Sequence, residues 1–266
     1  MPHPKRFGWI PLLLAATLTV HAEIPTPTDL THTIERSRVL SMRIIKAHAL
    51  LGLNSRFKNP DKELEESYQA LNNNLIDIHT FLQKNPSGTN DQLLMLIEKA
   101  QKNFAMLTDK DLLHDIDPKR AIDFFKALEK SRVQINKAAE ILTKETAKRD
   151  PVFYTTRLST IAQKMAAVYL YKTWGIALPK LDEHFAMMTR KSGKSIKALN
   201  QFAQQASGDI SAEQKKEIEQ SIQAMKDQLT FFIMARKFKH FIPSLLYNKA
   251  NTIEDENDKI EGILVR

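Results

Sequence analysis

The stretch from Ile34 to Leu53, which reads IERSRVLSMRIIKAHALLGL, gives the clearest structural signal in the chain. Apolar residues dominate this run, which indicates one long apolar helix. Arginines interrupt the helix at positions 36, 38 and 43. Because an arginine is costly to bury without a partner, these side chains must meet either acidic residues or an anionic ligand.

A second segment, from Arg157 to Ile176, repeats this design about half the chain later. The breaks between helices also recur in order, with Ser87-Gly88 in the first half and Ser207-Gly208 in the second. Such a recurrence indicates an internal duplication of a helical unit. The sequence therefore predicts an all-α protein of two tandem antiparallel four-helix-bundle units of long helices, covering residues 23–149 and 150–266.

Prolines, glycines and capping residues set the expected helix boundaries. The chain has only 7 Gly and 11 Pro in 266 residues, which favours long helices with few breaks. The first helix is expected to be capped by Thr28 or Asp29 and to end at about Ser55. Further helices are expected at about 61–83, 90–107, 119–148, 151–176, 180–206 (with an irregularity at Ser192-Gly193), 211–241 (capped by Ser211), and from Pro243 towards Ile263.

Residues 1–22 have the pattern of a cleavable secretory signal peptide. Lys5 and Arg6 give a basic start, the apolar core WIPLLLAATLTV follows, and Val20-His21-Ala22 forms a small-residue cleavage site. The alternative is an uncleaved N-terminal anchor, although the apolar core is short for a membrane span. Either pattern predicts an exported, periplasmic protein, and that compartment argues against ATP or NAD as a cofactor.

Composition and motif searches exclude several classes of function. The chain has no Cys, which excludes disulfides, thiolate zinc sites and iron–sulfur ligation. Its net charge of +8 is spread along the chain, without a Lys/Arg-rich block of the nucleic-acid-binding type. No two histidines have the His-x-x-x-His spacing of a metal site. No Ser/His/Asp set or carboxylate pair indicates catalysis, so the sequence predicts neither an enzyme nor a cofactor.

The arginine helix carries the motif R-x-R-x-L-S-x-R-x-x-K between Arg36 and Lys46. This motif resembles the opening helix of the PilJ-type sensing module of type IV pilus chemotaxis transducers, and the related periplasmic domain of NarX-type nitrate/nitrite sensor kinases. The matches are Arg36, Arg38, Leu40, Ser41, Arg43 and Lys46; Ile34-Glu35 and Met42 replace the family's Ala-Gly pair and Gln. The second copy matches at Arg157, Gln163, Met165 and Ala166 and departs at Ser159 and Lys164, where the family has Arg.

The resemblance implies a site for a small anion such as nitrate, nitrite or a carboxylate. In the nitrate sensors the domain is a four-helix bundle that dimerises, and an opening-helix arginine from each subunit holds the anion at the interface. Arg38 corresponds to that arginine, and its counterpart in the second copy is Ser159. The candidate anion-binding residues are Arg36, Arg38, Ser41, Arg43, Arg157 and Lys164.

A structural role for the same residues remains open, because arginines of this kind also pair with acidic residues of neighbouring helices. Glu63, Glu65 and Glu66 are the expected partners in that case. The aromatic residues Tyr169, Tyr171 and Trp174 are expected in the core or at an interface more often than in a pocket. The acidic run 254–258 is expected to be a solvated helix face.

Two functions follow from these features. The first is an exported, sensor-like helical module that binds a small anion or relays a signal to a membrane receptor or to a pilus or chemotaxis component. The alternative is an envelope scaffold or interaction protein with no small-molecule ligand. The two differ in whether the arginines of the first helix face a ligand site or only carboxylates.

Overall fold

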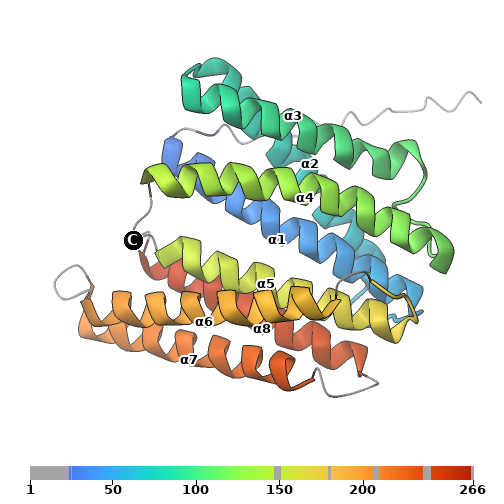
Figure 1. Cartoon of the computed structure of the whole chain (residues 1–266). Coiled ribbons are helices and arrows are strands. Elements are labelled where there is room, and N and C mark those ends of the chain that lie inside the picture. Colours follow the sequence, from blue (N-terminus) through green and yellow to red (C-terminus); the bar gives the residue numbers. More distant parts are fainter. Residues whose placement is uncertain are drawn as a thin grey trace, which may run out of the picture.

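The computed structural model describes residues 24, 26–146, 151–178, 181–205, 210–235 and 241–264. Within these residues the chain forms α1 (Pro27–Gly52), α2 (Pro60–Lys84), α3 (Gly88–Asp109), α4 (Pro118–Thr146), α5 (Pro151–Thr173), α6 (Leu181–Gln205), α7 (Ala212–Ala235) and α8 (Pro243–Leu264). The protein is all-helical, as the sequence predicts, and its helices pack side by side like a bundle (Figure 1). The expected leader, residues 1–22, lies outside the described residues.

Short capping motifs explain where several helices begin. Thr26, rather than Thr28 or Asp29, caps α1, because its side chain accepts a hydrogen bond from the backbone N–H of Asp29. The side chains of Asn59 and Ser87 cap α2 and α3 in the same way. At the start of α7 the expected cap is confirmed, because the Ser211 hydroxyl accepts from the Gln214 N–H while the Gln214 side chain accepts from the Ser211 N–H.

The expected ends of α1 and α5 were wrong, as was the irregularity expected in α6. α1 ends at Gly52 rather than near Ser55, because the chain turns at Asn54, which has a positive φ of 52°. α5 ends at Thr173 rather than near Ile176, and the chain turns at Gly175, which has a positive φ of 85°. α6 continues without a break through Ser192-Gly193. Its Ser192 hydroxyl donates to the Thr189 carbonyl of the preceding turn, so this serine is satisfied within the helix and causes no irregularity.

The two arginine-bearing segments, α1 and α5, are the central helices of the protein. α1 contacts α2, α4 and α5, whereas α5 contacts α1, α6, α7 and α8 (Figure 1). Every residue of α5 from Leu158 to Tyr171 is buried. A helix covered on all sides has no solvent-exposed polar stripe, which explains why this part of α5 lacks the amphipathic pattern of an ordinary surface helix. No described helix is long and apolar enough to cross a membrane.

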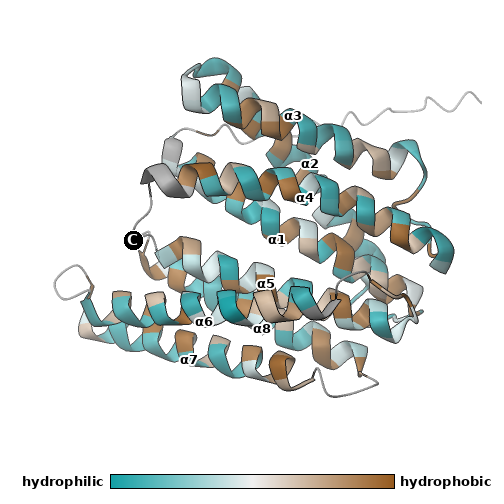
Figure 2. Ribbon diagram, viewed as in Figure 1, coloured by the Kyte–Doolittle hydropathy of each residue, from teal (hydrophilic) through white to brown (hydrophobic). Residues whose placement is uncertain are grey.

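The outer helices bury one stripe each, and these stripes join a single apolar cluster with members from all eight described helices. Figure 2 shows the alternation of hydrophobic and hydrophilic residues along the outer helices. On α2 the buried positions include Leu64, Leu71, Leu75, Ile78 and Leu82, which follow the three-and-four spacing expected from the sequence. Tyr169 and Tyr171 are also buried in this cluster, which confirms their expected place in the core.

A buried histidine joins α1 to α5 near one end of their contact. His48 stacks on Phe124 with ring centroids 3.7 Å apart. Its Nε2 lies 2.9 Å from the carbonyl oxygen of Asp115, and its Nδ1 lies 2.8 Å from the hydroxyl of Tyr171. Because a carbonyl only accepts, Nε2 carries the proton, and Nδ1 accepts from the tyrosine. Burial lowers the pKa of His48 to about 4, so the neutral ring belongs to the folded state.

The end of α1 offers a packing test, because the indole of Trp174 covers Gly52. A Cβ added at Gly52 would lie 2.1 Å from an indole carbon of Trp174. We expect Gly52→Ala to lower the free energy of unfolding by about 1–2 kcal/mol, since overpacking outweighs the helix propensity gained. Urea denaturation measures the loss, and Trp174 fluorescence reports displacement of the indole.

The matched control for this change is Gly193→Ala in α6. A Cβ at Gly193 meets nothing within 4 Å, so only helix propensity acts there. This variant should be more stable than wild type by about 0.5–1 kcal/mol. Equal effects of the two substitutions would contradict the proposed contact between Gly52 and Trp174.

Candidate functional site

The arginines of α1 lie on two different sides of the helix. Arg38 projects towards α4, whereas Arg36 and Arg43 line a groove beside α2 and α8. Ser41 is fully buried, and its hydroxyl donates to the Arg38 carbonyl at 2.7 Å. The structure therefore divides the residues that the motif groups together, and the Ser41 hydroxyl is engaged within its own helix.

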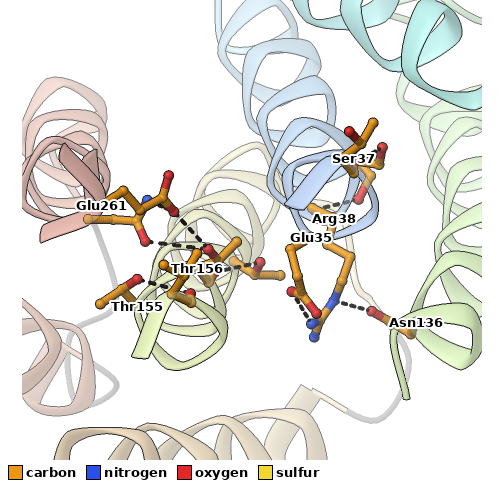
Figure 3. Close-up of polar contacts among 12 residues, drawn as sticks. Glu35, Ser37, Arg38, Asn136, Thr155, Thr156 and Glu261 are labelled. Carbon is orange, nitrogen blue, oxygen red and sulfur yellow. Dashed lines mark hydrogen bonds and ion pairs between the residues drawn. The ribbon is translucent and has the colours of Figure 1, made fainter. Parts of the chain in front are cut away.

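Arg38 is held by polar groups on both sides of its guanidinium. Its Nε donates to Oδ1 of Asn136 on α4 at 2.8 Å, and its Nη1 lies 2.5 Å from Oε2 of Glu35 (Figure 3). The side chain of Arg38 is 13% exposed and that of Glu35 is 2% exposed. The acidic partner is thus a neighbour on α1 itself rather than one of the expected glutamates of α2.

Arg157 of α5 and Lys191 of α6 lie close enough to Arg38 to interact with it electrostatically. Burial lowers the pKa of Arg157, and the positive charge of Arg38 lowers it further. Burial and the charges of Arg157 and Arg38 likewise lower the pKa of Lys191. We call Arg38, Arg157 and Lys191 the junction cluster, because it lies where α1 approaches α5.

The acidic groups around the junction cluster do not bond Arg157. Glu35 and Glu140 act on it electrostatically, and its guanidinium lies 5.7 Å from the centroid of the Phe153 ring. Among the described residues, none forms a hydrogen bond or an ion pair with its guanidinium. A half-buried cation beside a second cation is unfavourable without an anion, which makes the junction cluster a candidate anion site.

Ser159 does not face Arg38, contrary to the expectation from the motif. Its hydroxyl lies 3.4 Å from the carbonyl oxygen of Ile253, so it points towards α8. The residue of α5 that interacts electrostatically with Arg38 is Arg157, two positions earlier.

Lys164 belongs to a neighbouring ion-pair set with α4. Its Nζ lies 3.3 Å from Oε1 of Glu129, and Arg132 donates to the same carboxylate through Nε at 2.6 Å. Burial opposes the charge of Glu129, yet Arg132 and then Lys164 lower the pKa of Glu129 to about 2. Burial and the charge of Arg132 lower the pKa of Lys164 to about 8. The ammonium group of Lys164 is therefore already paired with the carboxylate of Glu129.

On the opposite side of α1 lies a groove of about 440 Å³. Arg36, Arg43, Lys58 and Lys62 supply its positive charge, while Glu63 and Glu66 supply negative charge. The Nε of Arg43 lies 2.9 Å from Oε2 of Glu254 on α8. Burial opposes the charge of Arg43, but the carboxylate of Glu254 outweighs it and raises the pKa of Arg43. The groove thus carries both positive and negative side chains. Arg43 already forms an ion pair with the carboxylate of Glu254.

A buried polar network continues inwards from this groove. Lys46 is fully buried; its Nζ lies 3.0 Å from Oε1 of Glu63 and 4.0 Å from the ring centroid of Tyr247, and donates to Oδ1 of Asn251 at 2.6 Å. Burial lowers the pKa of Lys46, and Glu63 opposes that effect. We call the buried network the set Arg43, Lys46, Glu63, Gln163, Tyr247, Asn251 and Glu254.

The buried network corrects one expectation about α8. Residues 254–258 are not all solvated, because Glu254 pairs with Arg43 and Asn257 is only 5% exposed. Gln163 of α5 donates to Glu254 Oε2 at 2.8 Å, which ties the two central helices to α8. These contacts are stabilising and leave little room for a ligand.

No protein-family model, curated protein or solved structure matches this chain. Within the described residues, no group of three or more His, Asp or Glu side chains is arranged to hold a metal ion.

Reasoning from the sequence missed Lys191 and Asn136. Lys191 is one of several lysines on an amphipathic helix, with Lys194 and Lys197 close by, and nothing in its spacing distinguishes it. Asn136 lies at a polar position of α4 with no motif around it. Only the packing of α4 and α6 around α1 and α5 brings these side chains to Arg38.

Proposed function

We propose that the protein is an exported, sensor-like helical module that binds a small anion where its two halves meet. The proposal includes a finer architecture, in which residues 23–149 and 150–266 each form a four-helix unit. The helix contacts support it, because α1, α2, α3 and α4 contact one another in a closed ring, as do α5, α6, α7 and α8. The two rings touch through α1 and α5.

The observation that carries the proposal is the junction cluster. Arg38 and Arg157 come from the corresponding helices of the two halves, and Lys191 adds a third positive charge. A planar anion would accept hydrogen bonds from the guanidinium of Arg157 and would relieve its repulsion with Arg38. Nitrate, nitrite and small carboxylates have this chemistry.

The motif resemblance supports the same place. In NarX-type sensors each subunit contributes an opening-helix arginine to the anion, and here α1 contributes Arg38 while α5 contributes Arg157. We further propose that the protein works in the periplasm and passes its ligand state to a membrane receptor or to a pilus or chemotaxis component.

The test is Arg157→Gln in the chain that begins at Glu23. Nitrate, nitrite and acetate should each be titrated calorimetrically, and Tm should be measured with and without the anion. We expect the variant to lose about tenfold to a hundredfold in anion affinity, as a lost charge-assisted hydrogen bond implies. Without anion its Tm should equal or exceed that of wild type, because an uncompensated cation has been removed.

Arg190→Gln is the matched control, since Arg190 is an exposed arginine beside Lys191 on α6. It should keep the affinity and Tm of wild type. The proposal would be contradicted if the wild type bound no anion, or if the Arg157 variant bound the anion as tightly as the wild type.

The second candidate function is an envelope scaffold without a ligand. It is favoured by the fact that Arg38 bonds Glu35 and Arg43 bonds Glu254, so both have structural partners. It predicts no anion-dependent change of Tm, and an unliganded Arg157→Gln variant that is less stable than wild type.

A further inference from the structure

Large apolar side chains gather on the surface at one end of the α7–α8 pair. Ile233 and Met234 lie at the end of α7 and are 39% and 62% exposed; Ile242 and Leu245 lie at the start of α8 and are 65% and 38% exposed. We call these four residues the α7–α8 tip. The other exposed large apolar residues of the described chain are scattered over different elements: Ile76, Met95, Ile116 and Val133.

The end of α7 and the start of α8 lie at the same end of the bundle, because α7 packs against α8 and the two helices are antiparallel (Figure 1). Figure 2 shows hydrophobic colour at this end of α7, next to the start of α8. The core behind the tip is already filled, because Phe232 is fully buried and Leu246 is 1% exposed. The exposed side chains are therefore surplus to the packing of the bundle, and an apolar surface patch of this kind marks an interaction site.

The chain on either side of the tip carries charge of one sign. The sequence contains no Asp or Glu between Asp227 and Glu254. Lys249 of α8 lies beside the tip, with its Nζ 5.5 Å from the ring centroid of Phe231. The connecting sequence 236–240 reads RKFKH and adds three further Lys or Arg residues; the tip is defined without it, since its structure is not described.

From this arrangement we propose that the α7–α8 tip inserts into the surface of a membrane rich in anionic phospholipid. Apolar side chains flanked by cations are the combination that enters the interface between headgroups and acyl chains. Each nearby Lys or Arg adds attraction to an anionic surface. The stretch of chain that forms the tip contains no acidic residue that anionic headgroups would repel.

A lipid surface fits the tip better than a folded protein partner does. A protein partner anchors its contacts in pockets. None of the tip residues lines the groove beside α1 or the acidic groove between α7 and α8, which Glu217, Asp255 and Asp258 help to form. The tip thus offers exposed side chains to insert and lines neither of these grooves. This proposal does not depend on the anion site, and either can fail without the other.

Vesicle flotation of the chain that begins at Glu23 tests the proposal. Vesicles of phosphatidylglycerol and phosphatidylethanolamine should bind it, and vesicles of phosphatidylcholine should bind it at least about tenfold more weakly. Binding should weaken as salt is raised, because the charges are screened. Met234→Glu with Ile242→Glu should reduce binding about tenfold or more, since both side chains would have to leave the apolar layer.

Met95→Glu is the matched control, because Met95 on α3 is 57% exposed but stands alone. The absence of cysteine permits a second measurement that does not depend on a disruptive substitution. An environment-sensitive fluorophore on Met234→Cys should shift to the blue with phosphatidylglycerol vesicles, whereas the same label on Met95→Cys should not.

Three results would overturn the assignment to lipid. One is an equal loss of vesicle binding in the Met95 and tip variants. Another is a fluorophore at position 234 whose emission does not shift when phosphatidylglycerol vesicles are added. The third is failure to bind either vesicle together with capture of an envelope protein that the tip variant loses, which would identify a protein partner instead.

Discussion

Replacing Lys46 with methionine is expected to lower the free energy of unfolding by about 3 kcal/mol. Lys46 is fully buried, and its Nζ lies 3.0 Å from the carboxylate of Glu63. Removing the lysine leaves that carboxylate, which is 11% exposed, without its main counter-charge. Breaking a buried ion pair typically costs about 3–5 kcal/mol. We expect the lower end, because Arg43 also attracts Glu63. Urea denaturation at neutral pH measures the loss.

Lys62→Met is the control for this prediction. Lys62 and Glu66 form an ion pair at 3.5 Å in which both side chains are about two-thirds exposed, so removing it should cost about 0.2–0.5 kcal/mol. Lys46→Met combined with Glu63→Gln should recover part of the loss, because the uncompensated charge is then gone. If Lys46→Met costs no more than Lys62→Met, the buried network does not stabilise the fold in the way its geometry indicates.

Protonation of His48 should destabilise the protein as the pH falls from about 6.5 to about 4. The unfolded chain binds this proton near the ordinary pKa of 6.5, whereas burial lowers the pKa of the folded state to about 4. The stabilising contribution is therefore complete above pH 6.5, declines below it, and is lost once the pH has passed through about 4. At about 1.4 kcal/mol for each pKa unit, the loss amounts to about 3 kcal/mol.

The measurement is the free energy of unfolding at several pH values between 7.5 and 4. His48→Gln should be less stable than wild type at neutral pH, because the stacking on Phe124 is lost, but its stability should depend less on pH. The same change at His114, whose side chain is 60% exposed, should leave the pH dependence as it is in wild type. A wild-type curve that is flat across this range would contradict the buried, neutral state of His48.

The helices could be predicted from the sequence because their signals are local. Pro60, Ser87 and Pro243 lie at helix starts, and the stripe on α2 follows directly from the spacing of its leucines. The packing at the end of α1 could not be predicted in this way, because the side chain that covers Gly52 is Trp174, which comes from a distant part of the chain.

The candidate site could be predicted only in part, because ion-pair partners depend on tertiary packing. The motif identified Arg38 and Arg157, which do approach each other. It did not indicate that Glu35, one turn away on the same helix, would bond Arg38. Nor could it indicate that Arg43 would bond Glu254, which lies more than two hundred positions further along. Spacing along one helix specifies which side chains share a face, but not what that face will meet.

The complete burial of α5 has a consequence for how the chain loses its structure. The apolar cluster passes without interruption from the outer helices of one half, through α1 and α5, to those of the other half. Separating the halves would expose the side of α1 that α5 covers, and α5 would lose its packing against α1. Unfolding of one half would therefore destabilise the other, and we expect the eight described helices to unfold in one cooperative transition.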